Sequence, residues 1–140
     1  VKNYKWHLFG KNYVQTKWKD ENNKWHSGFL HQLIIQLSEQ IIPDNFEIDH
    51  KDLNPLNNLD DNLRICTTMQ NSHNRKKHYD NTSGYKGVYC HKEHKKWKSQ
   101  IMINGKIKFL GYFLIKEDAA KAYNNAAIQY FGEFAQLNDI

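Results

Sequence analysis

An acidic residue and a histidine stand side by side where a short β-prone run ends. The run is "FEIDH", residues 46–50, and the pair is Asp49-His50. Such a pair is compatible with a surface position at a strand end, or with a metal ligand beside a general base. Two asparagines extend the second interpretation: Asn62 lies 12 residues beyond the histidine and Asn71 lies 21 residues beyond it.

These residue types suit one kind of chemistry. Oxygen ligands from Asp49 and Asn71 would hold a hard divalent cation, with water and phosphate oxygens completing its shell. A neutral His50 imidazole beside that cation could take a proton from water, while the cation stabilises charge on a leaving oxygen. The combination predicts phosphodiester hydrolysis with a hard divalent cation as cofactor.

The elements that must bring these residues together follow in order along the chain. A strand ends at residue 50, and a loop rich in Asn, Asp and Pro runs to residue 62. "LRICT", residues 63–67, is a second strand, and Thr67 or Thr68 can cap a helix running to about Lys77. A hairpin packed on that helix would place Asn71 near the end of the first strand.

Two further groups of elements flank this hairpin. Before it, aromatic-rich segments at residues 4–9, 13–18 and 24–30 predict an antiparallel meander. "LHQLIIQL" then has apolar residues at 30, 33, 34 and 37, which is helical spacing. The polar run "DNTSG", residues 80–84, predicts a boundary between domains at 1–79 and 80–140.

The C-terminal segment has its own pattern. Three strand-like runs are followed by a helix at residues 116–131 that Gly132 is placed to end. Asn104-Gly105 predicts a short hairpin between the last two strands. Alternation turns Trp97 and Ile101 toward the helix, and it turns Lys98, Gln100 and Met102 to the opposite face.

The composition limits the class of protein. The 140 residues are 39% hydrophobic, with a mean hydropathy of −0.86, and no apolar run is long enough to span a membrane. The net charge of +5 and a pI near 9.1 favour a polyanion partner. Cys66 and Cys90 lie far apart, which indicates neither a zinc ribbon nor a disulfide framework and suits a reducing interior. With the polyanion partner that the charge favours, we expect an intracellular location with access to DNA.

Charge is also distributed unevenly around the candidate site. Six acids lie between residues 44 and 61, whereas Arg64, Arg75, Lys76 and Lys77 follow between 64 and 78 with no acid. This order suits a cation site beside a phosphate site, so Arg64, Arg75 and Lys76 are candidate DNA contacts. A solvated loop followed by a solvated helix end is the alternative.

The stretch "EIDHKDLNPLNNLDDNLRICTTMQNSHNRK" resembles the ββα-metal core of HNH (His-Me finger) endonucleases, particularly the homing branch. The resemblance covers roughly residues 4 to 78. It implies that His50 is the general base, that Asp49 and Asn71 ligate Mg²⁺ or a similar ion, and that Asn62 hydrogen-bonds within the loop and orients the histidine. Relatives usually have glycine where Leu53 stands, which predicts a different turn or strain there.

Residues 82–138 resemble the Apetala-type DNA-binding domain of ethylene-response factors, through "YKGV", "LGYF" and the closing "LN". Such domains lay a three-stranded sheet in the major groove of DNA. By position, six residues fall where relatives contact DNA: Lys86, Tyr89, His91, Lys96, Gln100 and Met102.

Together these observations predict an α+β chain. It has a ββα-metal nuclease core preceded by a small antiparallel meander, then a three-stranded antiparallel sheet packed on one helix. The predicted function is metal-dependent cleavage of double-stranded DNA by a homing-type endonuclease. We expect a monomer, with no membrane and no protein partner. The alternative is a DNA-binding regulatory protein with a decayed nuclease core.

Overall fold

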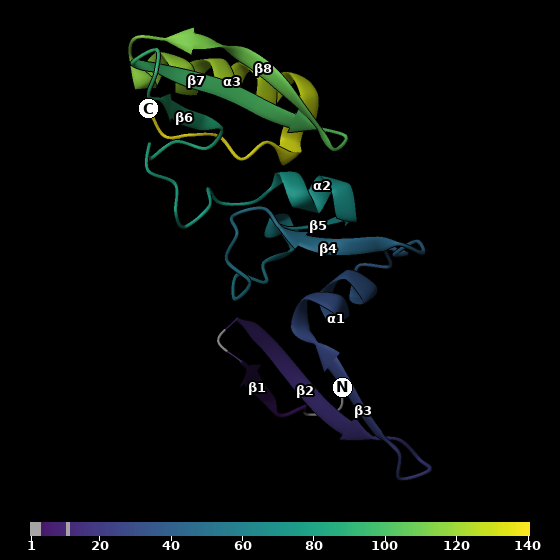
Figure 1. Ribbon diagram of the computed structural model, residues 1–140. Helices are drawn as coiled ribbons and strands as arrows, with labels where there is room; N and C mark the ends of the chain where they lie inside the picture. Colours follow the sequence, from purple (N-terminus) through teal and green to yellow (C-terminus); the bar gives the residue numbers. More distant parts are fainter. Residues whose placement is uncertain (1–3, 11) are drawn as a thin grey trace. The chain divides into compact units, whose positions relative to one another are not determined.

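The computed structural model describes residues 4–10 and 12–140, and the chain divides into two compact units, up to Asn71 and from Ser72 (Figure 1). All three sheets are antiparallel, and the mixture of strands and few helices confirms the α+β class. None of the described helices is long and apolar enough to span a membrane. The division lies earlier than the predicted boundary at residues 79 and 80, so the segment 72–79 is grouped with the second unit.

The first unit opens with the expected meander. Strands β1 (Trp6–Phe9), β2 (Tyr13–Lys19) and β3 (Trp25–Phe29) form one sheet in that order, and helix α1 (Leu30–Leu37) follows β3 directly. The predicted helix is present, with Ile35 1% exposed, whereas Leu37, one of the apolar residues whose spacing predicted the helix, is 74% exposed. Two turns of helix offer too few positions for periodicity alone to define the buried face.

The hairpin that carries the candidate site follows. Strand β4 (Phe46–His50) pairs with β5 (Leu63–Thr67) through five residue pairs, from Phe46 opposite Thr67 to His50 opposite Leu63. The loop between them ends in a short 3-10 turn, η1 (Asp60–Asn62), and helix α2 (Thr68–His73) follows β5 without a break. The predicted order of strand, loop, strand and helix is therefore present.

Helix α2 is shorter than expected. It ends at His73 rather than near Lys77. The ammonium of Lys86 donates to the carbonyl oxygens of His73 at 2.9 Å and of Arg75 at 2.8 Å. The His73 ring also stacks on Phe131, with ring centroids 3.8 Å apart. These contacts lie within the second unit, and the Lys86 ammonium satisfies carbonyl groups at the end of α2 that have no partner inside the helix.

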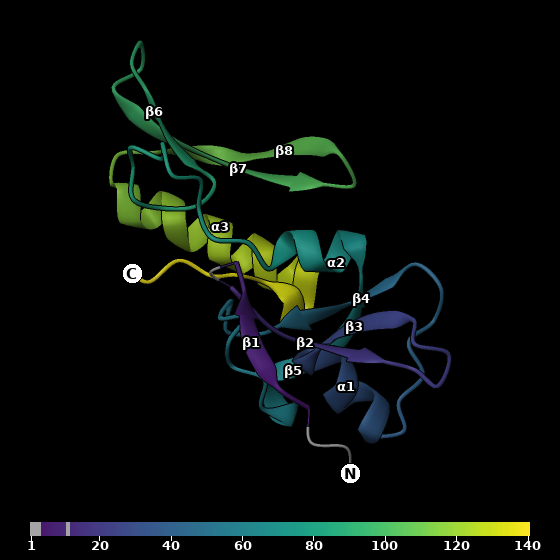
Figure 2. The ribbon, with the colours of Figure 1, turned by 90° about the horizontal axis from the view of Figure 1, so that it is seen from below.

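The second unit is a sheet covered by one helix. Strands β6 (Val88–His91), β7 (Lys96–Ile103) and β8 (Lys106–Phe113) lie in that order, and α3 (Lys116–Phe131) runs along one face of the sheet (Figures 1 and 2). The 3-10 turn η2 (Gly132–Phe134) follows α3. Two clusters fill the space between helix and sheet, and they consist of Val88, Ile101, Ala119, Ala120, Tyr123, Ala126 and Ala127.

Several local predictions for this unit are confirmed. Helix α3 has the predicted bounds and Gly132 follows it with φ of 54°. Asn104 and Gly105 both have positive φ, 50° and 75°, as the tight turn between β7 and β8 requires. Trp97 packs on the inner cluster, whereas Met102 is 58% exposed on the other face.

Two glycines of this unit offer a test of the packing. Gly84 and Gly87 both have left-handed backbones, with φ of 84° and 75°, but a Cβ at Gly84 would meet nothing within 4 Å. A Cβ at Gly87 would overlap the Tyr123 ring and lie 2.6 Å from the Gln100 carbonyl oxygen. We expect Gly84→Ala to cost about 1–2 kcal/mol of unfolding free energy through backbone strain alone. Gly87→Ala should cost a further 1–3 kcal/mol or so through overpacking.

Urea unfolding of the full chain measures both variants. Equal losses in the two would contradict the close approach of Gly87 to Tyr123.

Candidate active site

His50 is held at the end of β4 by a bond to the loop. Nε2 of its ring lies 3.2 Å from Oδ1 of Asn58, and His50 is 7% exposed. The Asn58 amide nitrogen donates to the carbonyl of Leu56 at 3.1 Å, which directs the amide oxygen toward the histidine. Nε2 is then the donor, so the neutral imidazole carries its lone pair on Nδ1. The structure thus presents a histidine in a defined tautomer.

Aromatic rings from the N-terminal elements surround this histidine. His31 of α1 meets it edge-on, with ring centroids 5.4 Å apart, and Tyr13 of β2 lies at 6.4 Å. Phe29 stacks on His31, with ring centroids 5.5 Å apart. Burial, with a smaller contribution from His50, lowers the pKa of His31 to about 4, so His31 is uncharged at neutral pH. Tyr13 is 37 positions from His50, and no local pattern in the sequence indicated that they meet.

Asn62 closes the loop that follows His50. Its amide nitrogen donates to Oδ1 of Asp52 at 3.0 Å and to the carbonyl of Asn57 at 2.7 Å. Its amide oxygen accepts the backbone N–H of Asp52 at 3.1 Å, and its own carbonyl accepts from Lys51 at 2.9 Å. Asn62 therefore bonds within the loop as predicted, while the side chain bonded to the histidine ring is Asn58, which sequence reasoning treated only as a turn former.

Asp49 is buried beside a cation. It is 5% exposed, and Arg64, directly opposite on β5, donates to its Oδ2 from Nε at 2.9 Å and from Nη2 at 2.7 Å. Only 10% of the Arg64 side chain is exposed. The guanidinium is thus engaged with Asp49, whereas the predicted role for Arg64 was a contact to DNA phosphate.

Asn71 of α2 lies over the face of the hairpin that carries Glu47 and Asp49. Its amide nitrogen donates to Oε2 of Glu47 at 2.7 Å. Glu47 and Asp49 are two residues apart on β4, so their side chains share one face of the strand. Asn71 therefore lies over the face that carries Asp49. Cys66, on β5 opposite Glu47, is fully buried, and burial is the main cause that raises the pKa of its thiol to about 11.

This donor set fits a hard cation. Asp49 supplies carboxylate oxygen and Asn71 supplies amide oxygen, and both are ligand types that Mg²⁺ and Mn²⁺ prefer over the nitrogen and sulfur ligands of zinc sites.

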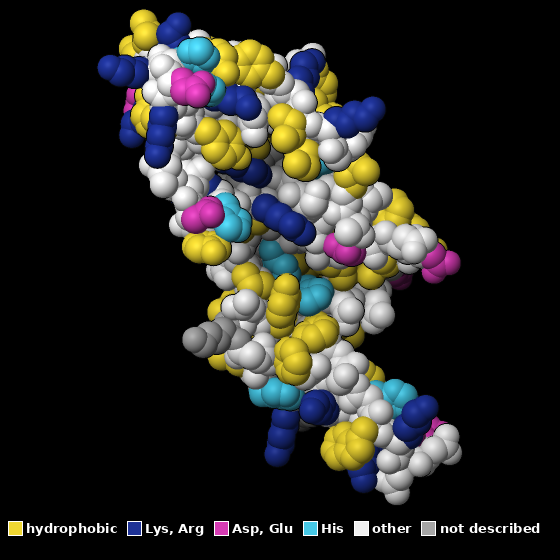
Figure 3. Space-filling view, viewed as in Figure 1, with side chains coloured by type: hydrophobic (Ala, Val, Ile, Leu, Met, Phe, Trp, Pro, Cys, Tyr) yellow, Lys and Arg dark blue, Asp and Glu magenta, His cyan; other side chains and the backbone are white. Residues whose placement is uncertain are grey.

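The predicted DNA contacts of the second unit fall into two groups. Tyr89, Lys96 and Met102 are exposed on the sheet face away from α3, and lysine and hydrophobic side chains lie side by side there (Figure 3). Phe109 and Tyr112, which the sequence did not single out, are 51% and 42% exposed on the neighbouring strand β8.

The other positions are more enclosed. Lys98 and Gln100 are half-buried, and the side-chain oxygen of Gln100 is buried with no hydrogen-bond partner. Burial, and next the charge of Arg75, lowers the pKa of Lys86 to about 8, and its ammonium is engaged by two carbonyls. Arg75 is exposed, while Lys76 lines a polar cavity of about 470 Å³ together with Lys77 and Lys86.

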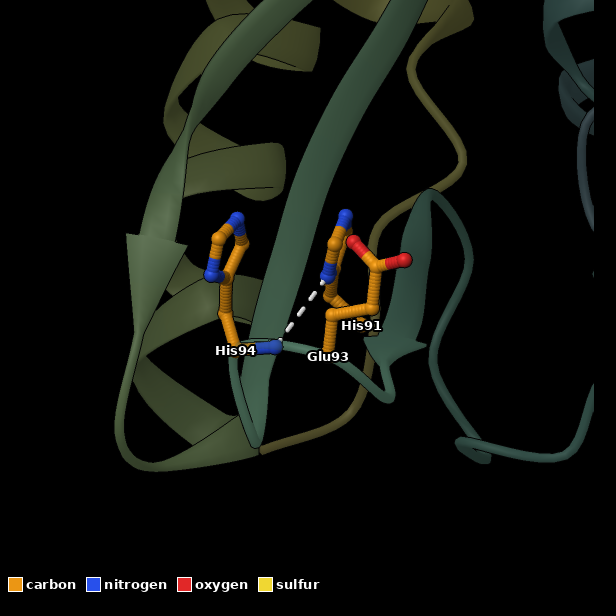
Figure 4. Close-up of side chains that lie close together, drawn as sticks. All are labelled: His91, Glu93 and His94. Carbon is orange, nitrogen blue, oxygen red and sulfur yellow. Dashed lines mark hydrogen bonds between the residues drawn. The ribbon is translucent and has the colours of Figure 1, made fainter.

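His91 lies with His94 and Glu93 at the β6–β7 turn (Figure 4). The two imidazoles stack with centroids 4.5 Å apart, and the backbone N–H of His94 donates to His91 Nδ1 at 3.4 Å. Ligand atoms of the three residues lie within 4.8 Å of one another. The stacked rings present their faces to each other rather than their lone pairs, so this contact closes the turn.

Comparison with known proteins identifies the first unit. Residues 29–73 match the model of a family described as HNH endonuclease. An uncharacterized HNH endonuclease of Acanthamoeba polyphaga mimivirus is 36% identical over 140 residues, which is all of this chain and 70% of that protein. The chain belongs to the HNH endonuclease family. Protein 3.8 of Escherichia phage T7 is 45% identical over 65 residues, 46% of this chain and 54% of that protein.

The prediction of a nuclease is therefore confirmed. The HNH match runs from the last residue of β3 to the last residue of α2, so it includes His31, Asp49, His50, Asn62 and Asn71. It ends where the second unit begins, one residue after Ser72.

The loop of this HNH endonuclease carries strain at a single residue. Leu53 has φ of 61°, a left-handed backbone, and its N–H donates to the His50 carbonyl at 2.9 Å. Leu53→Gly should raise the unfolding free energy by about 0.5–1 kcal/mol, because relief of strain exceeds the added freedom of the unfolded chain. Leu59→Gly is the matched control: Leu59 has φ of −63°, so the same change should lower stability. Chemical unfolding of both variants decides, and a loss in both would show that Leu53 is unstrained.

Proposed function

We propose that this HNH endonuclease is a divalent-metal-dependent enzyme of the homing type that hydrolyses phosphodiester bonds in duplex DNA, with the C-terminal sheet binding the DNA. The observation that carries the proposal is the arrangement around β4. Asn58 fixes His50 in one tautomer. Asp49, the residue before His50, shares a strand face with Glu47, which binds Asn71.

His50 acts as the general base. Nδ1 takes a proton from a water molecule, and the oxygen of that water forms a new bond to phosphorus while the bond from phosphorus to the 3′ oxygen breaks. The leaving 3′ oxygen gains a proton from solvent, which leaves a 3′ hydroxyl and a 5′ phosphate. The Asn58 amide supports this role because it accepts from Nε2–H and stabilises the imidazolium that forms.

Asp49 and Asn71 would hold the cation, with one oxygen each. When bound, a divalent cation there supplies positive charge that stabilises the leaving 3′ oxygen. Arg64 holds the Asp49 carboxylate in place through two bonds to one oxygen, and this supports a fixed ligand position. Asn62 keeps the loop closed over His50, which limits the movement of the base.

The C-terminal sheet binds the duplex with the face opposite α3. Lysines on this face supply charge for phosphates, and exposed Tyr89, Met102, Phe109 and Tyr112 supply apolar contact to base edges. Lys86 serves a different purpose from the one its position in the sequence predicts, because it holds the backbone of residues 73–75. The exposed Arg75 and Lys76 remain candidates for phosphate contacts.

The first test removes the base. His50→Ala should lower cleavage of duplex DNA at neutral pH, in Mg²⁺ or Mn²⁺, by roughly 10²- to 10⁴-fold. His7→Ala, an exposed histidine on β1, is the control and should cleave as the wild type does. DNA binding in EDTA should be unchanged in both. Full activity in a folded His50→Ala protein would refute the assignment, and a wild type that binds DNA but never cuts would favour the regulatory alternative.

The second test concerns the sheet face and uses the full chain carrying His50→Ala, in EDTA, so that DNA stays intact. Lys98→Ala should make the slope of log K against log[salt] shallower by about 0.9, the share of one phosphate. Gln100→Ala should change the preference among DNA sequences and leave the slope unaltered, because the amide nitrogen of Gln100 can donate to a base edge and carries no charge. If neither variant alters DNA binding, the sheet face is not the one that binds.

A further inference from the structure

We infer that Glu47 is a positioning residue, which fixes the side-chain amide of Asn71 in the orientation that a cation ligand needs. The inference rests on the proposed function, because it concerns the same cation. Glu47 receives two bonds from α2: Asn71 Nδ2 donates to Oε2 at 2.7 Å, and Thr68 Oγ1 donates to Oε1 at 2.9 Å. One carboxylate of β4 is thus bound to the first and fourth residues of the helix.

The bond to Glu47 decides which end of the Asn71 amide faces the hairpin. An ionised carboxylate only accepts hydrogen bonds, so it selects the NH₂ end of the amide. The opposite rotamer would set the amide oxygen against the carboxylate oxygens and lose a charge-assisted bond. The oxygen of Asn71 is therefore turned away from Glu47, and it is the oxygen that a hard cation binds.

The backbone of Asn71 is fixed by the helix that carries it. Asn71 is the fourth residue of α2, and Thr68, the first residue of the same helix, is also bonded to Glu47. Cys66, opposite Glu47 in the β4–β5 ladder, is 0% exposed, so this part of the hairpin belongs to the core. What remains variable is rotation of the amide, and Glu47 is the group that restricts it.

The decisive variant is Glu47→Gln, which keeps the shape of the side chain and replaces one accepting oxygen by a donor. The Mn²⁺ concentration for half-maximal cleavage should rise about 10- to 100-fold, as is usual when a group that orients a metal ligand is lost. The rate at saturating Mn²⁺ should stay within about threefold of the wild type. The affinity for Mn²⁺ in the absence of DNA should weaken by the same factor. It is measured from the loss of the electron paramagnetic resonance signal of free Mn²⁺.

Two matched variants separate positioning from other effects. Asp44→Asn removes the same charge from the exposed loop just before β4 and should leave Mn²⁺ binding unchanged. Thr68→Val removes the other partner of Glu47 and should weaken Mn²⁺ binding by a smaller factor. In the metal-free protein, the side-chain NH₂ of Asn71 should be protected from hydrogen exchange, and Glu47→Gln should reduce that protection.

The outcomes distinguish the ligand role of Asn71 from the positioning role of Glu47. If Asn71→Ala leaves Mn²⁺ binding unchanged, the proposed ligand is wrong. If Asn71→Ala weakens binding but Glu47→Gln lowers only the stability of the protein, the ligand stands and the positioning role of Glu47 is refuted. If Asp44→Asn weakens binding as much as Glu47→Gln, general charge and not amide orientation is responsible, which also refutes it.

Discussion

The register of the β4–β5 ladder is the constraint on which the rest of the site depends. Side chains alternate along a strand, so a slip by one residue would exchange the faces of Asp49 and His50. The ion pair between Asp49 and Arg64, opposite each other and nearly enclosed, opposes such a slip. Removing one partner of a buried pair leaves an uncompensated charge, which typically costs about 3–5 kcal/mol. The ion pair therefore stabilises the register of β4 and β5.

The loop between the two strands extends this order to the base. Twelve residues of polar loop would ordinarily have many conformations, but the Asn62 side chain joins the beginning of the loop to its middle. Asn58 is then placed to meet the His50 ring. Leu53 has a left-handed backbone in the same turn, which is unfavourable for a leucine. The bonds of Asn62 therefore hold the loop in a conformation that its local sequence does not favour. The tautomer of the histidine is consequently set by contacts that are distant from its own strand.

The sequence predicted most where a local pattern determines the structure. The turn at Asn104-Gly105, the bounds of α3 and the inward face of β7 follow from turn chemistry and alternation over a few residues. The residues around Asp49, His50, Asn62 and Asn71 led to the HNH endonuclease family, and the comparison with known proteins confirms that membership. The bond between Glu47 and Asn71 spans 24 positions and depends on how α2 packs, so no local pattern contained it. The end of α2 was misplaced for a similar reason, since the carbonyls at its end are bonded to Lys86, a contact that no local pattern contained.

Helix α2 belongs to both compact units, because the division falls between Asn71 and Ser72. The polar run at residues 80–84 has the composition of a domain boundary. However, Lys86 and Phe131, which follow it, contact His73, which precedes it. A recombination event at that run would strip the C-terminal unit of the backbone to which it is bonded. An intact second unit therefore has to include the end of helix α2, a segment that the HNH family match also covers.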